Sequence, residues 1–151
     1  MSTDRRATLL KLLVQATDSY ERALDERLRA SLGDDLRPAH YTVFRHLEPT
    51  GSRVTALAEA AGMTQQSMGE LVTHLERRGY VERRPDPADR RARLVVATAA
   101  GAEALAVAGA HIRRIEEALS GELGGPTVDE MRAALARIPD VLTALSGAGE
   151  R

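Results

Sequence analysis

Apolar residues recur every three or four positions along most of the chain, which is the spacing of amphipathic helices. The first such run covers about 3–31 and is followed by Gly33, a residue that commonly ends a helix. A second helix is predicted to begin at Arg37-Pro38, because proline fits the first turn, and to break at Pro49-Thr50-Gly51. The N-terminal third is therefore expected to be a long helix followed by a shorter one.

The middle of the chain combines two helices with two strands. A short helix is predicted over 54–61, ending at Gly62, and Thr64 then caps an amphipathic helix that runs to about Arg78. The apolar side of that helix carries Met68, Leu71, Val72 and Leu75. Segments 80–84 and 92–96 have the composition of short strands, and the turn-rich segment 85–91 joins them into a hairpin.

The last third of the chain is predicted to form two more helices. Thr98 caps the first, an alanine-rich helix that reaches about 119, and a loop of turn residues covers 121–126. Thr127 and Glu130 form a capping box that starts the second helix. Pro139 lies inside this helix, where we expect a kink or a restart.

Segment 54–73 has the spacing of a helix-turn-helix. Ala58 is small where the second helix must cross, and Gly62 allows a left-handed backbone in a short turn. The alternative is an αα-hairpin that only packs, but a basic hairpin follows directly. The sequence therefore predicts a mainly α protein with a small β-hairpin wing, a winged helix-turn-helix that binds double-stranded DNA.

The outer face of the second helix carries the residues expected to meet DNA. They are Thr64, Gln65, Gln66, Ser67, Gly69, Glu70, Thr73, His74 and Arg77. Glutamine bonds adenine with two hydrogen bonds, and Ser or Thr bonds bases or phosphates. Glu70 would be repelled by phosphate unless it accepts from a cytosine amine or pairs with an arginine. An equal alternative is that Glu70 is a solvated surface charge with no role in DNA binding.

Arginines gather in segment 77–93 although the formal net charge of the chain is only -1. Binding depends on where charges lie, so this cluster matters more than the sum. In the hairpin we expect Arg84, Arg90 and Arg91 to contact DNA, with Arg91 entering the minor groove. Asp89 is expected to brace Arg91 or Arg90, because a free carboxylate near DNA is costly.

Composition argues against several other functions. The chain has no cysteine, which excludes disulfides and thiol chemistry, and its four histidines lack metalloprotease spacing. No glycine-rich phosphate loop or nucleophile elbow is present, so neither an enzyme nor a cofactor is expected. A metal-responsive regulator remains an alternative if His40 and His111 converge. No apolar run is long enough to span a membrane, and a cytoplasmic location is expected.

The motifs resemble those of the multiple antibiotic resistance regulator (MarR) family. The similarity runs from Leu57-Ala58-Glu59 through 75–83 and 86–91 to Thr98-Ala99-Ala100-Gly101. It implies one intertwined subunit with an N-terminal dimerisation helix in 1–35, the DNA-binding region in 36–98 and C-terminal dimerisation helices in 99–151.

The resemblance also implies how the protein works. Members of the family are homodimers that place the second helix of the motif in the major groove and the wing arginine, here Arg91 braced by Asp89, in the minor groove. Many repress genes and release DNA when a small aromatic or phenolic ligand binds. The residues expected at such a cleft are His40, Tyr41, Phe44 and His111. The alternative is a dimeric protein-interaction module on the same scaffold.

Overall fold

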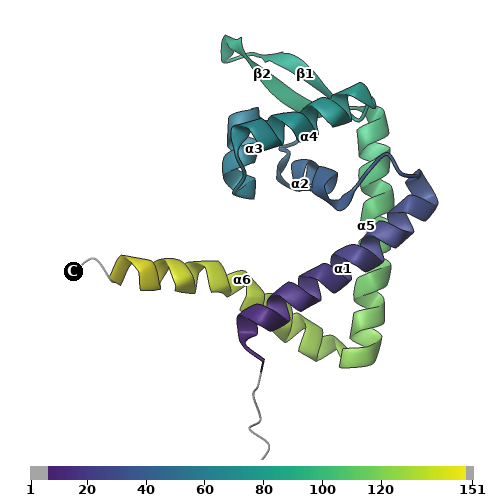
Figure 1. Ribbon diagram of the computed structural model, residues 1–151, viewed down its shortest axis with the longest axis vertical. Helices are drawn as coiled ribbons and strands as arrows, with labels where there is room; N and C mark the ends of the chain where they lie inside the picture. The colour runs from purple at the N-terminus through teal and green to yellow at the C-terminus, as the bar shows by residue number, and fades with distance from the viewer. Residues whose placement is uncertain (1–6, 149–151) are drawn as a thin grey trace, which may run out of the picture. The chain divides into compact units, whose positions relative to one another are not determined.

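The computed structural model describes residues 7–148 and is mainly helical (Figure 1). Its elements are α1 (Leu9–Leu32), α2 (Pro38–His46), α3 (Val54–Ala61), α4 (Gln65–Arg77), β1 (Val81–Asp86), β2 (Asp89–Ala97), α5 (Ala99–Leu123) and α6 (Gly125–Ala148). Two compact units divide the chain between His111 and Ile112, inside α5. None of the helices in this part of the chain is long and apolar enough to cross a membrane.

Helix α1 begins later than the sequence pattern predicted. Thr8 caps it by accepting a hydrogen bond from the backbone N–H of Lys11, so the predicted start at Thr3 is too early. Ala7 and Thr8 are not helical, and residues 3–6 lie outside the described part of the chain. The predicted end is correct, because Gly33 has a φ of 77° and its N–H bonds the carbonyl of Arg29.

Helices α3 and α4 form the predicted helix-turn-helix. Gly62 ends α3 in the left-handed conformation, with φ 64° and ψ 31°, and the cap at Thr64 starts α4. Ala58 is buried where α4 packs on α3, and α2 packs against both helices. Met68, Val72 and Leu75 of α4 have no exposed surface. The apolar side of α4 thus fixes which side faces outward, as predicted.

The wing, defined as β1, β2 and the turn between them, is longer than predicted. Strand pairing continues to Asp86 and resumes at Asp89, so Pro87 and Ala88 alone make the turn and the expected turn over 85–91 is wrong. The register shifts between Pro85 and Asp86, which lets proline lie in the strand. Figure 1 shows the wing projecting beyond α3 and α4.

The base of the wing is attached to the helix-turn-helix by a third short strand segment. Ser52, just before α3, exchanges two backbone hydrogen bonds with Val95 of β2. No local pattern around Ser52 predicted this pairing. With it, the helical fold carrying one two-stranded hairpin confirms the predicted winged helix-turn-helix class.

The second unit contains the end of α5 and α6, and the ends of these two helices differ from the predicted ones. Gly124, with φ 91°, is the sole connecting residue, so the loop expected over 121–126 is wrong. Pro126 lies in the first turn of α6, where its missing N–H costs nothing. Thr127 is therefore inside the helix and does not cap it, and α6 continues through Pro139 without restarting.

Candidate nucleic-acid interface

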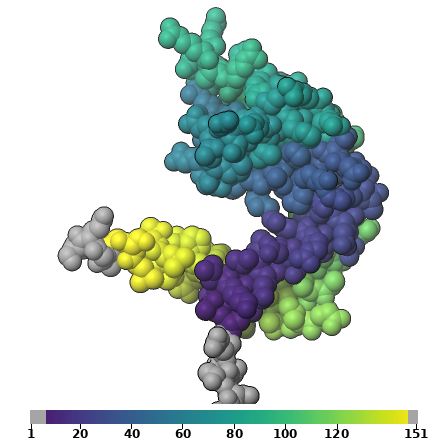
Figure 2. Space-filling view, in the orientation of Figure 1, coloured from purple at the N-terminus to yellow at the C-terminus, as the bar shows by residue number. Residues whose placement is uncertain are grey.

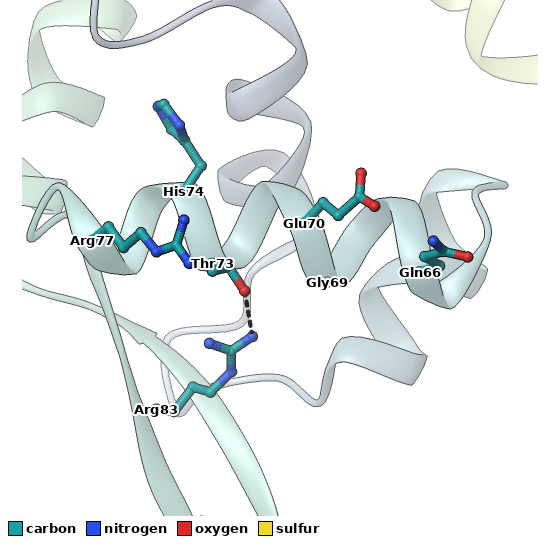
Figure 3. A pocket seen from close by; sticks show the side chains of 7 residues that line it. All are labelled: Gln66, Gly69, Glu70, Thr73, His74, Arg77 and Arg83. Carbon is teal, nitrogen blue, oxygen red and sulfur yellow. Dashed lines mark hydrogen bonds between the residues drawn. The ribbon is translucent and has the colours of Figure 1, made fainter.

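An open hollow runs along the outer face of α4 (Figure 3). Its lining residues are Gln66, Gly69, Glu70, Thr73, His74, Arg77 and Arg83. All but Arg83 were predicted from the sequence, because they lie opposite the apolar side of α4. A Cβ built on Gly69 meets nothing within 4 Å, so the middle of this face leaves room for a partner to approach closely.

The first turn of α4 contains two residues that cap the helix and two exposed glutamines that do not. The hydroxyl of Thr64 accepts from the backbone N–H of Ser67 and donates to the hydroxyl of Ser67, at 3.1 and 2.9 Å. These two predicted DNA contacts therefore also hold the helix terminus. Gln65 and Gln66 are exposed beside them, and the amide of Gln66 extends from the end of the hollow (Figure 3).

His74 is held by its neighbours on the side facing α2. Its Nε2 lies 2.9 Å from the carbonyl oxygen of Asp35 and must donate, since a carbonyl only accepts. The ring stacks on His40 with centroids 4.2 Å apart and planes at 12°. His40 accepts from the N–H of Arg37, and its pKa is lowered by burial and by the nearby His74. The His74 ring thus links α4 to α2.

Arg83 of β1 reaches across to α4. Its Nη1 donates to Oε1 of Glu76 at 2.7 Å, and its Nη2 donates to Oγ1 of Thr73 at 3.4 Å. Arg84, and not Arg83, was expected to contact DNA. Strand alternation was the missed signal: Arg83 shares a face with the buried Val81, whereas Arg84 points the other way and pairs with Glu82.

The tip of the wing is exposed and carries free positive charge. Within residues 7–148, Arg90 and Arg91 have no carboxylate partner, and neither does Arg77 of α4. Oδ1 of Asp89 accepts from the backbone N–H of Arg91 at 3.0 Å. Asp89 was expected to brace Arg91 or Arg90, and in the structure it holds the backbone of Arg91. Figure 2 shows the wing tip standing clear of the helices of the first unit.

A second ion pair ties the turn end of β1 to the residue that precedes α3. The guanidinium of Arg53, the residue that precedes α3, donates twice to Oδ2 of Asp86, at 2.9 and 2.7 Å. Oδ1 of Asp86 accepts from the N–H of Ala88, and this bond together with Arg53 lowers the pKa of the carboxyl. Sequence reasoning missed both roles, because the two residues lie 33 positions apart.

The four residues expected at a ligand cleft make contacts with different neighbours. Tyr41 and Phe44 lie in α2 with ring centroids 6.1 Å apart, and His111 shares a 2.8 Å hydrogen bond with Ser31. Among the described residues, no hydrogen bond or ring contact joins His40 to His111, and no group of three or more acidic or histidine side chains is arranged to hold a metal. Burial, with Tyr80 nearby, raises the pKa of Tyr41 to about 12.

Known proteins with similar sequences are transcriptional regulators. The model of the MarR family matches residues 34–92. The transcriptional regulator HosA of Escherichia coli O111:H- is 38% identical over 92 residues, which are 60% of this chain and 68% of HosA. Other HosA sequences are 40% identical over 75 residues, and the chain spans 56% of their length.

Solved structures share the fold over most of the chain. CouR from Rhodococcus jostii RHA1, solved bound to p-coumaroyl-CoA, is 27% identical with a TM-score of 0.63, covering 84% of this chain and 88% of CouR. MepR of S. aureus, solved as a DNA complex, is 19% identical with a TM-score of 0.73, covering 90% and 99%. By sequence and fold, the chain belongs to the MarR family, whose members are transcriptional regulators and not enzymes.

Proposed function

We propose that this protein is a homodimeric repressor that binds a near-palindromic DNA operator and is released by a small aromatic or phenolic ligand. The observation that carries DNA binding is the exposed polar face of α4 beside a wing whose tip arginines have no carboxylate partner. The major groove is wide enough to admit an α-helix such as α4, and the narrow cationic tip of the wing fits the minor groove. MepR, which shares the fold, was solved with DNA bound.

In the proposed complex the predicted contacts divide into two groups. Gln65, Gln66, Thr73 and Arg77 face the bases and phosphates of the major groove, with Glu70 accepting from a cytosine amine. Arg90 and Arg91 contact the minor groove, and Asp89 holds the backbone of Arg91 in place. Thr64 and Ser67 set the start of α4 against a phosphate.

Exposed apolar side chains support the homodimer. At the start of α1, Leu9 and Leu10 are 64% and 73% exposed, and along α6 Leu142 and Leu145 are 55% and 67% exposed. On each of these helices, exposed apolar surface of this kind is costly in water unless a partner covers it. A second copy would cover the same surface on both subunits and place two copies of α4 about 34–36 Å apart, one helical turn of DNA.

Buried polar atoms without partners support a ligand. The hydroxyl of Tyr41 and Nδ1 of His111 are both buried and accept or donate no hydrogen bond. Such atoms cost free energy unless a bound molecule or water satisfies them. Phe44 lies beside Tyr41 and offers an aromatic surface. The p-coumaroyl group bound by CouR has the expected chemistry, and we infer a ligand of the same class for this chain.

The test begins with selection of bound duplexes from random DNA, followed by titration at several salt concentrations. We expect affinity to fall steeply with salt, as phosphate contacts require. Arg91→Ala should weaken binding to every sequence and make the salt slope shallower by about one per subunit, whereas Gln66→Ala should change the preferred sequence. Arg114→Ala, which removes an exposed arginine from α5, is the matched control and should behave like the parent.

Each part of the proposal has its own contrary result. Arg91→Ala that binds like the parent overturns the role of the wing. A monomer in sedimentation overturns the dimer. Absence of any duplex preference at low ionic strength, together with salt-insensitive capture of a protein, supports the interaction module instead. Stoichiometric metal in the purified protein supports the metal-responsive alternative. Release of DNA on addition of metal alone would show that a metal ion, and not an aromatic ligand, is the effector.

A further inference from the structure

We propose that Arg83 is a positioning residue for DNA specificity, which turns the Thr73 hydroxyl into a hydrogen-bond donor aimed at the major groove. This inference rests on the proposed DNA-binding function. Figure 3 shows the arrangement: Thr73 lies midway along the hollow of α4, and the guanidinium of Arg83 approaches its oxygen from the wing.

The hydrogen bond from Arg83 makes the hydroxyl of Thr73 an acceptor on that side and leaves its O–H free to donate elsewhere. A hydroxyl has one O–H to donate and lone pairs to accept with, and a guanidinium can only donate. When Nη2 of Arg83 donates to Oγ1, the hydroxyl cannot donate back. A helical threonine often donates to the carbonyl four residues earlier, as Thr143 does to Pro139, but Thr73 makes no such bond. Its O–H is therefore available to a partner in the hollow.

The position of Arg83 is itself fixed, which makes it suited to orient another group. Its side chain is only 24% exposed, and Glu76 binds its other nitrogen at 2.7 Å, one turn along α4 from Thr73. The carboxylate of Glu76 also offsets part of the attraction between Arg83 and a phosphate. Arg83 thus differs from Arg77, Arg90 and Arg91, which have no carboxylate partner in the described chain.

The consequence is a defined chemical preference at one position of each half-site. Thr73 held as a donor selects an acceptor on the base edge, which in the major groove is N7 or O6 of guanine, N7 of adenine or O4 of thymine. The amine of cytosine is a donor and is disfavoured. One such hydrogen bond corresponds to about three- to tenfold discrimination between bases.

The experiment is binding-site selection followed by affinity measurement on duplexes that differ at single positions. Thr73→Val keeps the shape of the side chain and removes the hydroxyl, and Arg83→Gln removes the guanidinium. Both should lose the same about three- to tenfold preference at the same position, and the double variant should lose no more. Arg83→Lys keeps the charge but not the two-pronged reach, so it should lose the preference too.

The control is Arg132→Gln in α6, where an arginine also bonds two partners, Glu116 and Asp129. It should leave the base preference unchanged. The proposal is overturned if Thr73→Val or Arg83→Lys keeps the full parental base preference at this position. It is also overturned if Arg83→Gln weakens binding to all sequences equally. A parent that binds no duplex refutes the proposed function itself, whereas a parent that binds duplexes while these variants keep its preferences refutes only the role of Arg83.

Discussion

Gly101 packs against a backbone carbonyl, and we predict that Gly101→Ala destabilises the DNA-binding unit. A Cβ at Gly101 would lie 2.0 Å from the carbonyl oxygen of Tyr80 and 3.1 Å from its carbon. That oxygen cannot move freely, because it accepts from the N–H of Thr98, whose hydroxyl donates to the carbonyl of Gly79 at 2.5 Å. The methyl group therefore forces the start of α5 away from Tyr80, in the segment that joins α4 to β1.

The size of the effect follows from two opposing contributions. The new methyl lies more than 1 Å inside ordinary van der Waals contact with rigid backbone, and overpacking of this kind costs about 3 kcal/mol. Alanine in place of glycine stabilises a helix by about 1 kcal/mol. The net loss is about 2 kcal/mol, which lowers the unfolding midpoint by about 4–8 °C for a chain of this length.

Thermal unfolding followed by circular dichroism measures this loss, and Gly121→Ala is the matched control. Gly121 lies in the same helix, and a Cβ there meets nothing within 4 Å, so alanine should raise the midpoint by about 2–4 °C. Opposite shifts of the two variants support the packing argument. If Gly101→Ala proves as stable as the parent, the close approach of α5 to Tyr80 is wrong.

Two further predictions concern ionisable groups. Asp86→Asn leaves Arg53 without its carboxylate and should lower the unfolding midpoint at neutral pH; the difference from the parent should shrink as pH falls below 3.8, because the lowered pKa of Asp86 places its own protonation there. A constant difference down to pH about 2 contradicts this. The folded protein keeps His40 neutral below the ordinary pKa of 6.5, so the unfolded chain takes up the proton first and stability should decline as pH falls from about 8 to about 5. His40→Gln should flatten this decline in a series of unfolding curves, since glutamine can still accept from Arg37, and equal slopes in both proteins contradict the assignment.

The parts of the fold that the sequence predicted well are those with local signals. The bounds of α3 and α4 follow from Gly62 and Thr64, because a left-handed glycine and a side-chain cap act within one turn of the helix. The outer face of α4 follows from the spacing of its apolar residues. The loop predicted over 121–126 was wrong because local signals can be ambiguous. Glycine and proline are compatible with a loop, yet they also fit the first turn of a helix.

The contacts that the sequence could not predict join distant residues. Arg53 and Asp86 come from the start of α3 and the end of β1, and neither shows in its local pattern that the other is near. The stack of His40 on His74 is of the same kind. Arg83 is an intermediate case, because strand alternation from Val81 places it on the inner face, but its partners on α4 appear only in the folded protein.

The division of the arginines between structural and free roles changes what the basic segment can do. A count along 77–93 treats all its arginines alike, whereas the structure pairs Arg78 with Asp35, Arg83 with Glu76 and Arg84 with Glu82. The described residues that keep an unpaired guanidinium in this segment are Arg77, Arg90, Arg91 and Arg93. Each phosphate that an arginine neutralises releases a counterion and adds about 0.9 to the slope of log affinity against log salt. If paired arginines contribute little, the segment should give a slope of about 3.6 per subunit, and a slope of about 6 would mean that the ion pairs open when DNA binds.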